Sequence, residues 1–293
     1  MGTLVSIDNR LLSRRTARID IFDRGFLYGD SIYEAVRTYA GMPFAWAEHL
    51  ARLHRSAERV ELAVPVTDDE LGARLRRVLR AAANPESQVR LIVTRGGGPL
   101  SMSLDPRQAL AGRVIYLVRP LRPLPEKLYA DGVAVALVPL SPGESGVGPS
   151  AKTGSHLGQV LALGRATAQG AHEALMVDAR GNVTEGVSSN LFALLEGALV
   201  TPPLAMVLEG VTRGWVMALA RKAGLRVEER SLTAAELARA DELFLTSTLR
   251  EILPVTICDG REVGNGRVGP VTVRLRALFR EEIAAWIAAA GAR

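Results

Sequence analysis

Three prolines stand within the seven residues 119–125 of this chain. Because proline has no backbone N–H and a fixed φ, such a run continues neither a helix nor a central strand, and it is typical of a connector. A chain of 293 residues is long enough for two domains with separate cores. We therefore predict a small N-terminal α/β domain over 1–118, a connector over 119–129 and a larger C-terminal domain over 130–293.

Helical and extended periodicities occur on both sides of this run and predict an α+β fold. In 45–62 the apolar residues recur at helical spacing, and the charged residues face outward. Asp68 and Asp69 open a second helix that runs to about Ala82. The other predicted elements are strands over 33–39, 88–94, 113–118, 132–140, 225–230 and 242–247, helices over 157–168, 211–223 and 271–289, a hairpin around 179–182 and a Gly/Ser-rich loop over 141–151.

The composition is that of a soluble globular protein, with 48% hydrophobic and 23% charged residues. The longest apolar runs are far too short to span a bilayer, and no secretory signal pattern is present. The single cysteine, Cys258, excludes an internal disulfide framework and fits a reducing compartment. We expect Cys258 to be a small buried residue, and we expect a cytoplasmic protein with no membrane partner.

The net charge of +5 is compatible with nucleic-acid binding, but the pattern of charges argues against it. The arginines are scattered through predicted helices and alternate with Glu and Asp, and only 5% of residues are aromatic. We therefore expect no nucleic-acid partner and a preference for small anionic molecules.

Lys152 stands out because lysine is scarce here: only three of the 36 basic residues are lysines. It lies in Gly-Pro-Ser-Ala-Lys-Thr-Gly-Ser-His, whose small residues let a ligand approach the backbone. A lone carboxylate, Glu185, follows in Asn-Val-Thr-Glu-Gly-Val-Ser-Ser-Asn. Pyridoxal phosphate (PLP) chemistry requires an amine that can form a Schiff base and an acid that can pair with a pyridinium nitrogen. We therefore predict PLP as the cofactor, with Lys152 also moving the proton between the substrate Cα and the cofactor.

Three further segments offer groups that bind phosphate. Arg52, on the first predicted helix, provides a planar and permanently charged fork. The Gly turn in 208–213 runs into a helix, so the backbone N–H groups of Val211 and Thr212 would form an anion site. The Thr-Ser-Thr run 246–248 ends a strand with hydroxyls and amides. Taken singly, these features also fit a surface arginine, an ordinary helix cap and an ordinary turn, but their order along the chain favours one joint site.

The motifs together resemble those of the class IV (fold type IV) PLP enzymes, which include branched-chain and D-amino-acid aminotransferases and aminodeoxychorismate lyase. The resemblance runs nearly from end to end of the chain. The segments that carry it are 23–39 (DRGFLYGDSIYEAVRTY), 48–53 (EHLARL), 151–154 (AKTG), 173–178 (EALMVD), 183–192 (VTEGVSSNLF), 208–213 (LEGVTR) and 240–248 (ADELFLTST).

This resemblance implies a two-domain fold with a larger, β-barrel-like C-terminal domain that carries helices. It also implies a homodimer in which the 23–39 loop helps to build the substrate pocket. Lys152 would form the Schiff base and Glu185 would pair with the pyridine nitrogen. The implied cofactor contacts are Arg52, Lys152, Glu185, Ser189, Val211, Thr212, Ser247 and Thr248.

Several positions depart from the branched-chain pattern. Those enzymes usually carry a Tyr five residues after the Schiff-base Lys, where this chain has Leu157, preceded by His156. Tyr33 and the run 93–96 are more similar to the D-amino-acid enzymes. Those enzymes then place an Arg and a His as a carboxylate trap, and neither occurs in 97–102 of this chain.

A substrate carboxylate still needs a partner, because an unpaired buried charge is costly. Arg37, Arg90, Arg95 and Arg250 are candidates, and a structural salt bridge is an equally good interpretation of each. Arg37 should share one face of its strand with Tyr33. The predicted substrate contacts are Tyr28, Tyr33, Arg37, Arg90 and Leu249.

We expect an aminotransferase that moves the amino group of an amino acid to a 2-oxo acid by a ping-pong mechanism. Branched-chain or other aliphatic L-amino acids are favoured as substrates. The alternatives are a D-amino-acid aminotransferase and, after it, aminodeoxychorismate lyase, which eliminates pyruvate with the same cofactor and lysine.

Overall fold

The computed structural model describes residues 2–97, 103–140 and 151–291. The chain forms two compact units, Met1–Arg122 with Ala151–His156, and Pro123–Ser150 with Leu157–Arg293. The segment that carries Lys152 thus belongs with the N-terminal unit although it follows the Pro-rich run in the sequence. The stretch 98–102 and most of the predicted loop 141–151 lie outside the described residues.

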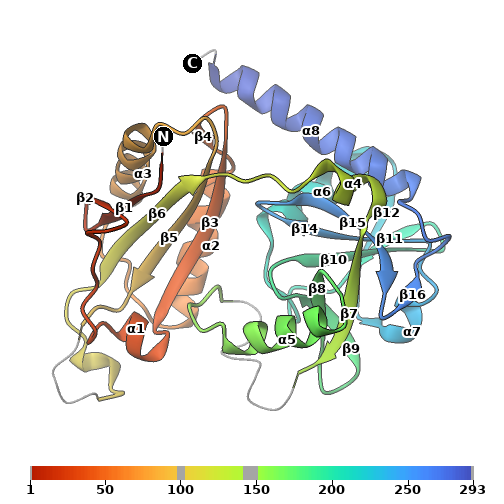
Figure 1. Ribbon diagram of the computed structural model, residues 1–293, viewed down its shortest axis with the longest axis horizontal. Coiled ribbons are helices and arrows are strands. Elements are labelled where there is room, and N and C mark those ends of the chain that lie inside the picture. The colour runs from red at the N-terminus through yellow and green to blue at the C-terminus, as the bar shows by residue number, and fades with distance from the viewer. Residues whose placement is uncertain (1, 98–102, 141–150, 292–293) are drawn as a thin grey trace. The chain divides into compact units, whose positions relative to one another are not determined.

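The first unit is built on an antiparallel sheet in the order β2-β1-β6-β5-β3-β4 (Figure 1). Its long strands β3, β5 and β6 pair along nearly their whole length. The elements of this unit are β1 (Leu4–Ile7), β2 (Arg10–Ser13), α1 (Arg24–Tyr28), β3 (Ser31–Tyr39), β4 (Met42–Pro43), α2 (Trp46–Arg59), α3 (Asp68–Ala82), β5 (Ser87–Thr94), the 3₁₀ helix η1 (Pro106–Gln108) and β6 (Arg113–Pro120).

The two long helices of this unit confirm the helical patterns in the sequence. α3 begins with a capping box between Thr67 and Glu70, and its apolar face buries Leu71 and Leu75. These residues and Leu53 of α2 join the same hydrophobic core as the inward residues of the sheet. Burial of this face stabilises both helices far more than their intrinsic propensity does.

The Pro-rich run is more structured than we expected. Strand β6 extends to Pro120, which pairs with Ser87 of β5. A proline is tolerated at this position because the pairing of β6 with β1 already ends at Val118. No residue of β1 therefore needs a hydrogen bond from the N–H that Pro120 lacks. In addition, helix α4 (Glu126–Asp131) begins directly after Pro125, inside the predicted connector.

The second unit contains a larger mixed sheet in the order β12-β11-β10-β14-β15-β7-β8-β9-β13, with β16 beside β15 (Figure 1). β7 runs parallel to both β15 and β8, and β11 runs parallel to β12. Its strands are β7 (Val133–Pro139), β8 (Glu173–Val177), β9 (Asn182–Gly186), β10 (Asn190–Leu195), β11 (Ala198–Thr201), β12 (Arg226–Glu229), β13 (Leu232–Thr233), β14 (Glu242–Ser247), β15 (Glu251–Cys258) and β16 (Arg261–Glu262). Its helices besides α4 are α5 (Leu157–Ala168), α6 (Val211–Lys222), α7 (Ala234–Leu237) and α8 (Pro270–Gly291).

The core of the second unit lies against this sheet. Leu175, Leu191, Leu245 and Leu253 are fully buried in one cluster that also contains Cys258. Burial raises the pKa of the Cys258 thiol to about 12, so Cys258 is the buried apolar residue that the sequence predicts, not a reactive thiol.

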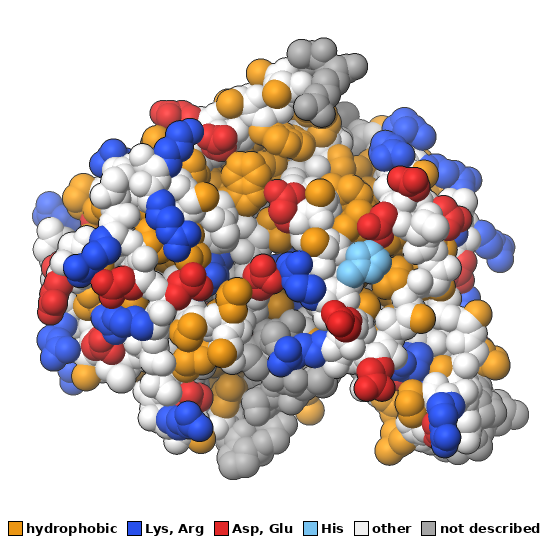
Figure 2. Space-filling view, turned by 180° about the vertical axis from the view of Figure 1, so that it is seen from behind, with side chains coloured by type: hydrophobic (Ala, Val, Ile, Leu, Met, Phe, Trp, Pro, Cys, Tyr) orange, Lys and Arg blue, Asp and Glu red, His pale blue; other side chains and the backbone are white. Residues whose placement is uncertain are grey.

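The charged residues of both units are mixed on the surface. Figure 2 shows Lys and Arg side chains interspersed with Asp and Glu over the visible face. Many of them pair locally, as Arg230 does with Glu228 and Glu236. None of the helices in the described ranges is long and apolar enough to cross a membrane.

Candidate active site

Lys152 is held by its own backbone against strand β3. Its N–H donates to Ser56 Oγ (3.1 Å), and its carbonyl accepts from the N–H of Tyr33 (2.9 Å). Two residues on, the Gly154 N–H donates to the carbonyl of Ser31 (2.8 Å). A Cβ on Gly154 would lie 2.2 Å from Ser31 Oγ, so only glycine allows this close approach. The position of the lysine Cα is therefore fixed on both sides.

The ring of Tyr33 forms the platform beneath the Lys152 amine. Lys152 Nζ lies 4.4 Å from the ring centroid, and the guanidinium of Arg90 lies 4.5 Å from it. The His156 ring packs edge-on at a centroid distance of 5.1 Å. Over the described part of the chain, the Lys152 amine has no ion pair, so no carboxylate neutralises it.

His156 brings a buried polar atom to this platform. Its Nε2 is buried without a hydrogen-bond partner among the described residues. Burial and the charges of Arg90 and Lys152 lower the pKa of His156 below its usual value, so the ring is neutral at pH 7.

Arg52 is a buried residue, and the alternative of a surface helix arginine is wrong. Its Nε and Nη2 donate to the two carboxylate oxygens of Glu34 at 2.8 and 2.6 Å. His49 Nδ1 lies 2.7 Å from Glu34 Oε2. Burial alone would raise the pKa of Glu34, but Arg52 and His49 outweigh it and lower the pKa to about 2. Glu34 and His49 were not predicted as site residues. The usable signal was the pair His49 and Arg52, two polar residues three positions apart on the apolar face of one helix.

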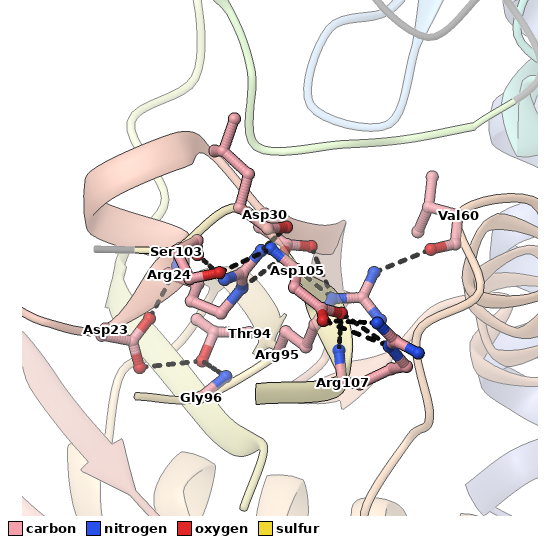
Figure 3. A network of polar contacts seen from close by, with 12 residues as sticks. Asp23, Arg24, Asp30, Val60, Thr94, Arg95, Gly96, Ser103, Asp105 and Arg107 are labelled. Carbon is pink, nitrogen blue, oxygen red and sulfur yellow. Dashed lines mark hydrogen bonds and ion pairs between the residues drawn. The ribbon is translucent and has the colours of Figure 1, made fainter. Parts of the chain in front are cut away.

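Among the other arginine candidates in this unit, Arg95 has its guanidinium fully engaged by neighbouring protein groups (Figure 3). Its guanidinium donates to Asp30 at 2.8 and 3.0 Å and to the carbonyls of Val60 and Glu61. Arg24 contacts the same Asp30 from α1 at 2.9 Å. For Arg95, the structural salt bridge is therefore the interpretation that its contacts support.

The remaining candidates of the first unit lie on α1 and β3. Tyr28 is half-buried, and its ring lies beneath the guanidinium of Arg24. Arg37 stacks on Tyr39, with its Cζ 4.1 Å from the ring centroid. β3 pairs with β5 from Ser31 to Arg37 without a register shift, so Tyr33 and Arg37 lie on one face of the strand.

In the second unit, Glu185 is fixed at one oxygen and tied to the start of α6. Its Oε2 accepts from Asn190 Nδ2 (3.1 Å) and from the N–H of Leu208 (3.0 Å). Asn190 also donates to the carbonyl of Leu208 (2.9 Å). A Cβ on Gly210 would lie 1.9 Å from Asn190 Oδ1, so this glycine is required at the helix start. No local sequence pattern marks Asn190 as the residue that orients Glu185.

The first turn of α6 carries the backbone N–H groups that the sequence analysis assigned to an anion. Gly210 is its N-cap and provides no side-chain cap, so the N–H groups of Val211 and Thr212 lack that partner. The neighbouring Arg213 is buried and engaged with Glu229 (2.8 Å) and the carbonyl of Pro202.

The segment after β14 collects the remaining predicted residues of this unit. Thr248 and Leu249 form the turn between β14 and β15 and are partly buried. Ser247 Oγ accepts from Arg250 Nε (3.1 Å). Ser189 donates its hydroxyl to Glu173 (2.9 Å). Thr246 Oγ1 is buried without a hydrogen-bond partner among the described residues.

The predicted residues thus fall into two sets, each coherent within its own unit. The first unit holds Tyr28, Tyr33, Arg37, Arg52, Arg90 and Lys152, and the second holds Glu185, Ser189, Val211, Thr212, Ser247, Thr248 and Leu249.

Comparison with known proteins supports the resemblance. Residues 31–258 match the family model "Amino-transferase class IV". A putative branched-chain-amino-acid aminotransferase of Methanocaldococcus jannaschii is 35% identical, over 96% of this chain and 97% of that protein. A D-alanine aminotransferase of Listeria monocytogenes is 36% identical, over 95% and 96%.

A solved structure supports the fold as well. The branched-chain aminotransferase of the archaeon Thermoproteus uzoniensis, with norvaline, matches with a TM-score of 0.86 at 31% identity, over 96% of this chain and 94% of that one. The predicted α+β fold, with a small antiparallel sheet followed by a larger mixed one, is confirmed. The chain therefore belongs to the class IV aminotransferase family.

Proposed function

We propose that this protein is a PLP-dependent transaminase that moves the amino group of a branched-chain or other aliphatic L-amino acid to a 2-oxo acid by a ping-pong cycle. The observation that carries the proposal is Lys152: its backbone is fixed on β3, and its amine rests on Tyr33 without a neutralising carboxylate among the described residues. A family name shared with transaminases sets the reaction class. Named relatives include both branched-chain and D-alanine enzymes, so the D-amino-acid reaction is the second candidate.

The donor set fits PLP. The uncapped first turn of α6, with Val211 and Thr212, offers N–H donors for a phosphate. Ser247 and Thr248 add hydroxyls, and we assign Arg52 and Ser189 to the same cofactor. Asn190 and Leu208 orient the Glu185 carboxylate through its Oε2, and we assign this carboxylate to the ring nitrogen. When bound, PLP supplies an electrophilic carbonyl carbon and an electron sink for the Cα electrons.

The residues of the chain then do three things. Lys152 Nζ would hold the cofactor, and as a free amine it would take and return the substrate Cα proton. Glu185 holds the ring nitrogen protonated. Tyr33 supports the amine and limits its movement.

We assign substrate contacts to the groups around Tyr33. Arg90 is exposed and its guanidinium lies over the Tyr33 ring, so we assign it to the substrate carboxylate. Tyr28, Arg37 and, in the second unit, Leu249 are the further substrate contacts of this proposal.

We further propose a cytoplasmic homodimer. Leu157, Val160 and Leu161 of α5 expose 70%, 62% and 43% of their surface at helical spacing. Apolar side chains gathered in this way are typical of surfaces that are covered in an oligomer. Sedimentation at micromolar concentration tests this, and a monomer would contradict it.

The reaction is tested by a half-reaction followed by cofactor absorbance. The loaded protein is mixed separately with L-leucine and with D-alanine, alongside Lys152→Ala and the control Lys127→Ala, whose side chain is 84% exposed. We expect L-leucine to remove the absorbance band of the lysine-bound cofactor in the wild type and in Lys127→Ala. A response to D-alanine alone would replace the proposal with the D-amino-acid reaction. No response to either would favour the lyase.

A further inference from the structure

The turn between β14 and β15 is tied to two other segments by a single arginine. Arg250 Nε donates to Ser247 Oγ (3.1 Å), and its Nη2 donates to Ser188 Oγ (2.9 Å) and to the carbonyl of Ser188 (3.3 Å). Its Nη1 pairs with Glu173 Oε2 at the start of β8. All three guanidinium nitrogens are engaged, so Arg250 does not have the open fork that a substrate carboxylate requires.

Glu173 is the anchor of this arrangement. Its side chain is 1% exposed, and its other oxygen accepts from the Ser188 N–H (2.9 Å), Ser188 Oγ (3.3 Å) and Ser189 Oγ (2.9 Å). A buried carboxylate with four donors holds its cationic partner firmly, because releasing that partner would leave an unpaired buried charge. The guanidinium of Arg250 therefore has one position.

The backbone after Arg250 is also constrained. Glu251 adopts φ 58°, in the left-handed region that is uncommon for a residue other than glycine. Its carboxylate is buried and pairs with Arg280 of α8 (3.2 Å). Ion pairs on both sides thus keep the turn in a conformation that it would not adopt by local preference alone.

The fixed position of Arg250 determines which hydrogen bonds the Ser247 hydroxyl can make. A serine hydroxyl has one hydrogen to donate and two lone pairs. Since Arg250 Nε–H occupies a lone pair, the hydrogen of Ser247 is left to donate, and the described residues give it no acceptor. A hydroxyl in this state is a donor for an anion.

We propose that Arg250 is a positioning residue that holds Ser247 as a hydrogen-bond donor to the cofactor phosphate. This rests on the proposed function, in which Ser247 contacts that phosphate. Arg250 acts through Ser247 and does not itself touch the cofactor or the substrate.

The test compares binding of pyridoxamine 5'-phosphate with binding of pyridoxamine, which lacks the phosphate. Neither forms a Schiff base with Lys152, so the ratio of the two dissociation constants isolates the phosphate contact. Titration calorimetry is carried out on the wild type, Ser247→Ala, Arg250→Met and the double variant. Arg230→Met is the matched control, because Arg230 also forms ion pairs in this unit, with Glu228 and Glu236.

We expect Ser247→Ala and Arg250→Met each to weaken pyridoxamine 5'-phosphate binding about tenfold, which is about 1.4 kcal/mol. Pyridoxamine binding and the Arg230→Met variant should not change. The double variant should bind as Ser247→Ala does, because Arg250 has no hydroxyl left to orient. Loss of the ion pair with Glu173 is followed separately by thermal melting, and the melting temperature should fall in Arg250→Met and in the double variant. Should Arg250→Met not fold, Arg250→Lys serves, since it keeps a charge for Glu173 but lacks Nε–H.

Three results would overturn the inference alone: unchanged phosphate-dependent binding in Arg250→Met, equal weakening for both ligands, or additive losses in the double variant. A wild-type protein that binds both ligands equally would instead overturn the phosphate site of the proposed function, and this inference with it.

Discussion

The buried group of Glu34, His49 and Arg52 predicts a specific loss of stability when Glu34 becomes neutral. Glu34 is fully buried, and its pKa is lowered from 4.5 to about 2. Since one pKa unit corresponds to about 1.36 kcal/mol, the ionised state of Glu34 contributes about 3 kcal/mol to folding at neutral pH. Glu34→Gln also removes the negative charge that pairs with Arg52, and breaking a buried ion pair costs about 3–5 kcal/mol. We therefore expect a loss of about 3 kcal/mol at pH 7.

The pH dependence of this loss has a definite sign. Because the folded-state pKa is depressed, the contribution is complete above pH 4.5 and is lost as the pH falls toward 2. Below pH 4.5 the unfolded wild type binds a proton at Glu34 that the folded protein does not. The difference between the wild type and Glu34→Gln should therefore shrink by about 1.4 kcal/mol per pH unit in this range.

Urea unfolding followed by tryptophan fluorescence measures this loss of stability in the first structural unit, which contains Glu34. The chain has three tryptophans, and replacing Trp215 and Trp286 with Phe leaves Trp46, which begins α2, as the reporter. The control is Glu58→Gln on the exposed face of the same helix, where a change within about 0.5 kcal/mol is expected. If the two variants were equally stable at pH 7 and their pH curves ran parallel, the reasoning about Glu34 would be refuted.

Three further changes test the candidate site. Glu185→Gln should retain the cofactor but slow Cα deprotonation at least tenfold, because an amide does not stabilise a pyridinium; unchanged turnover in stopped-flow assays would remove this role. Gly154→Ala should weaken cofactor retention in equilibrium dialysis, since its Cβ would lie 2.2 Å from Ser31 Oγ, and Ser31→Ala should restore retention. If Ser31→Ala did not restore retention, contact between residue 154 and Ser31 would not be what sets the position of Lys152. The pKa of His156, followed by NMR, should lie below 6.5 and rise in Lys152→Ala, because the charge of Lys152 helps to lower it; an unchanged pKa would separate the two side chains.

The elements that the sequence predicted well are those whose burial is periodic. α2 and α3 were located to within a few residues because each has one apolar face. Strand β15 was missed, since Pro254 in its middle argues against a central strand. The structure resolves this conflict by register: Pro254 pairs with Phe244 of β14, and pairing with β7 begins only at Val255. No local pattern contains that information.

The candidate site likewise contains residues that the sequence predicted and residues that it did not. Lys152 and Glu185 were identifiable because their chemistry is specific and their neighbours are small. The residues that orient the site were not, because each acts across a distance that the sequence does not specify. Glu34 lies on β3, His49 and Arg52 on α2, and Asn190 reaches Glu185 only because Gly210 leaves room for it.

The arginines illustrate what the structure adds to a list of candidates. Four were proposed for the substrate carboxylate, and sequence position gave no reason to separate them. What separates them is whether the guanidinium is already engaged. Arg95 is bound by Asp30 and two carbonyls, and Arg250 by Glu173 and two serines. Arg90 rests on the Tyr33 ring, an aromatic contact that orients a guanidinium while leaving its N–H groups to another partner. Arg90 and Lys152 both contact the Tyr33 ring, and Arg90 is therefore the arginine to which the proposed function assigns the substrate carboxylate.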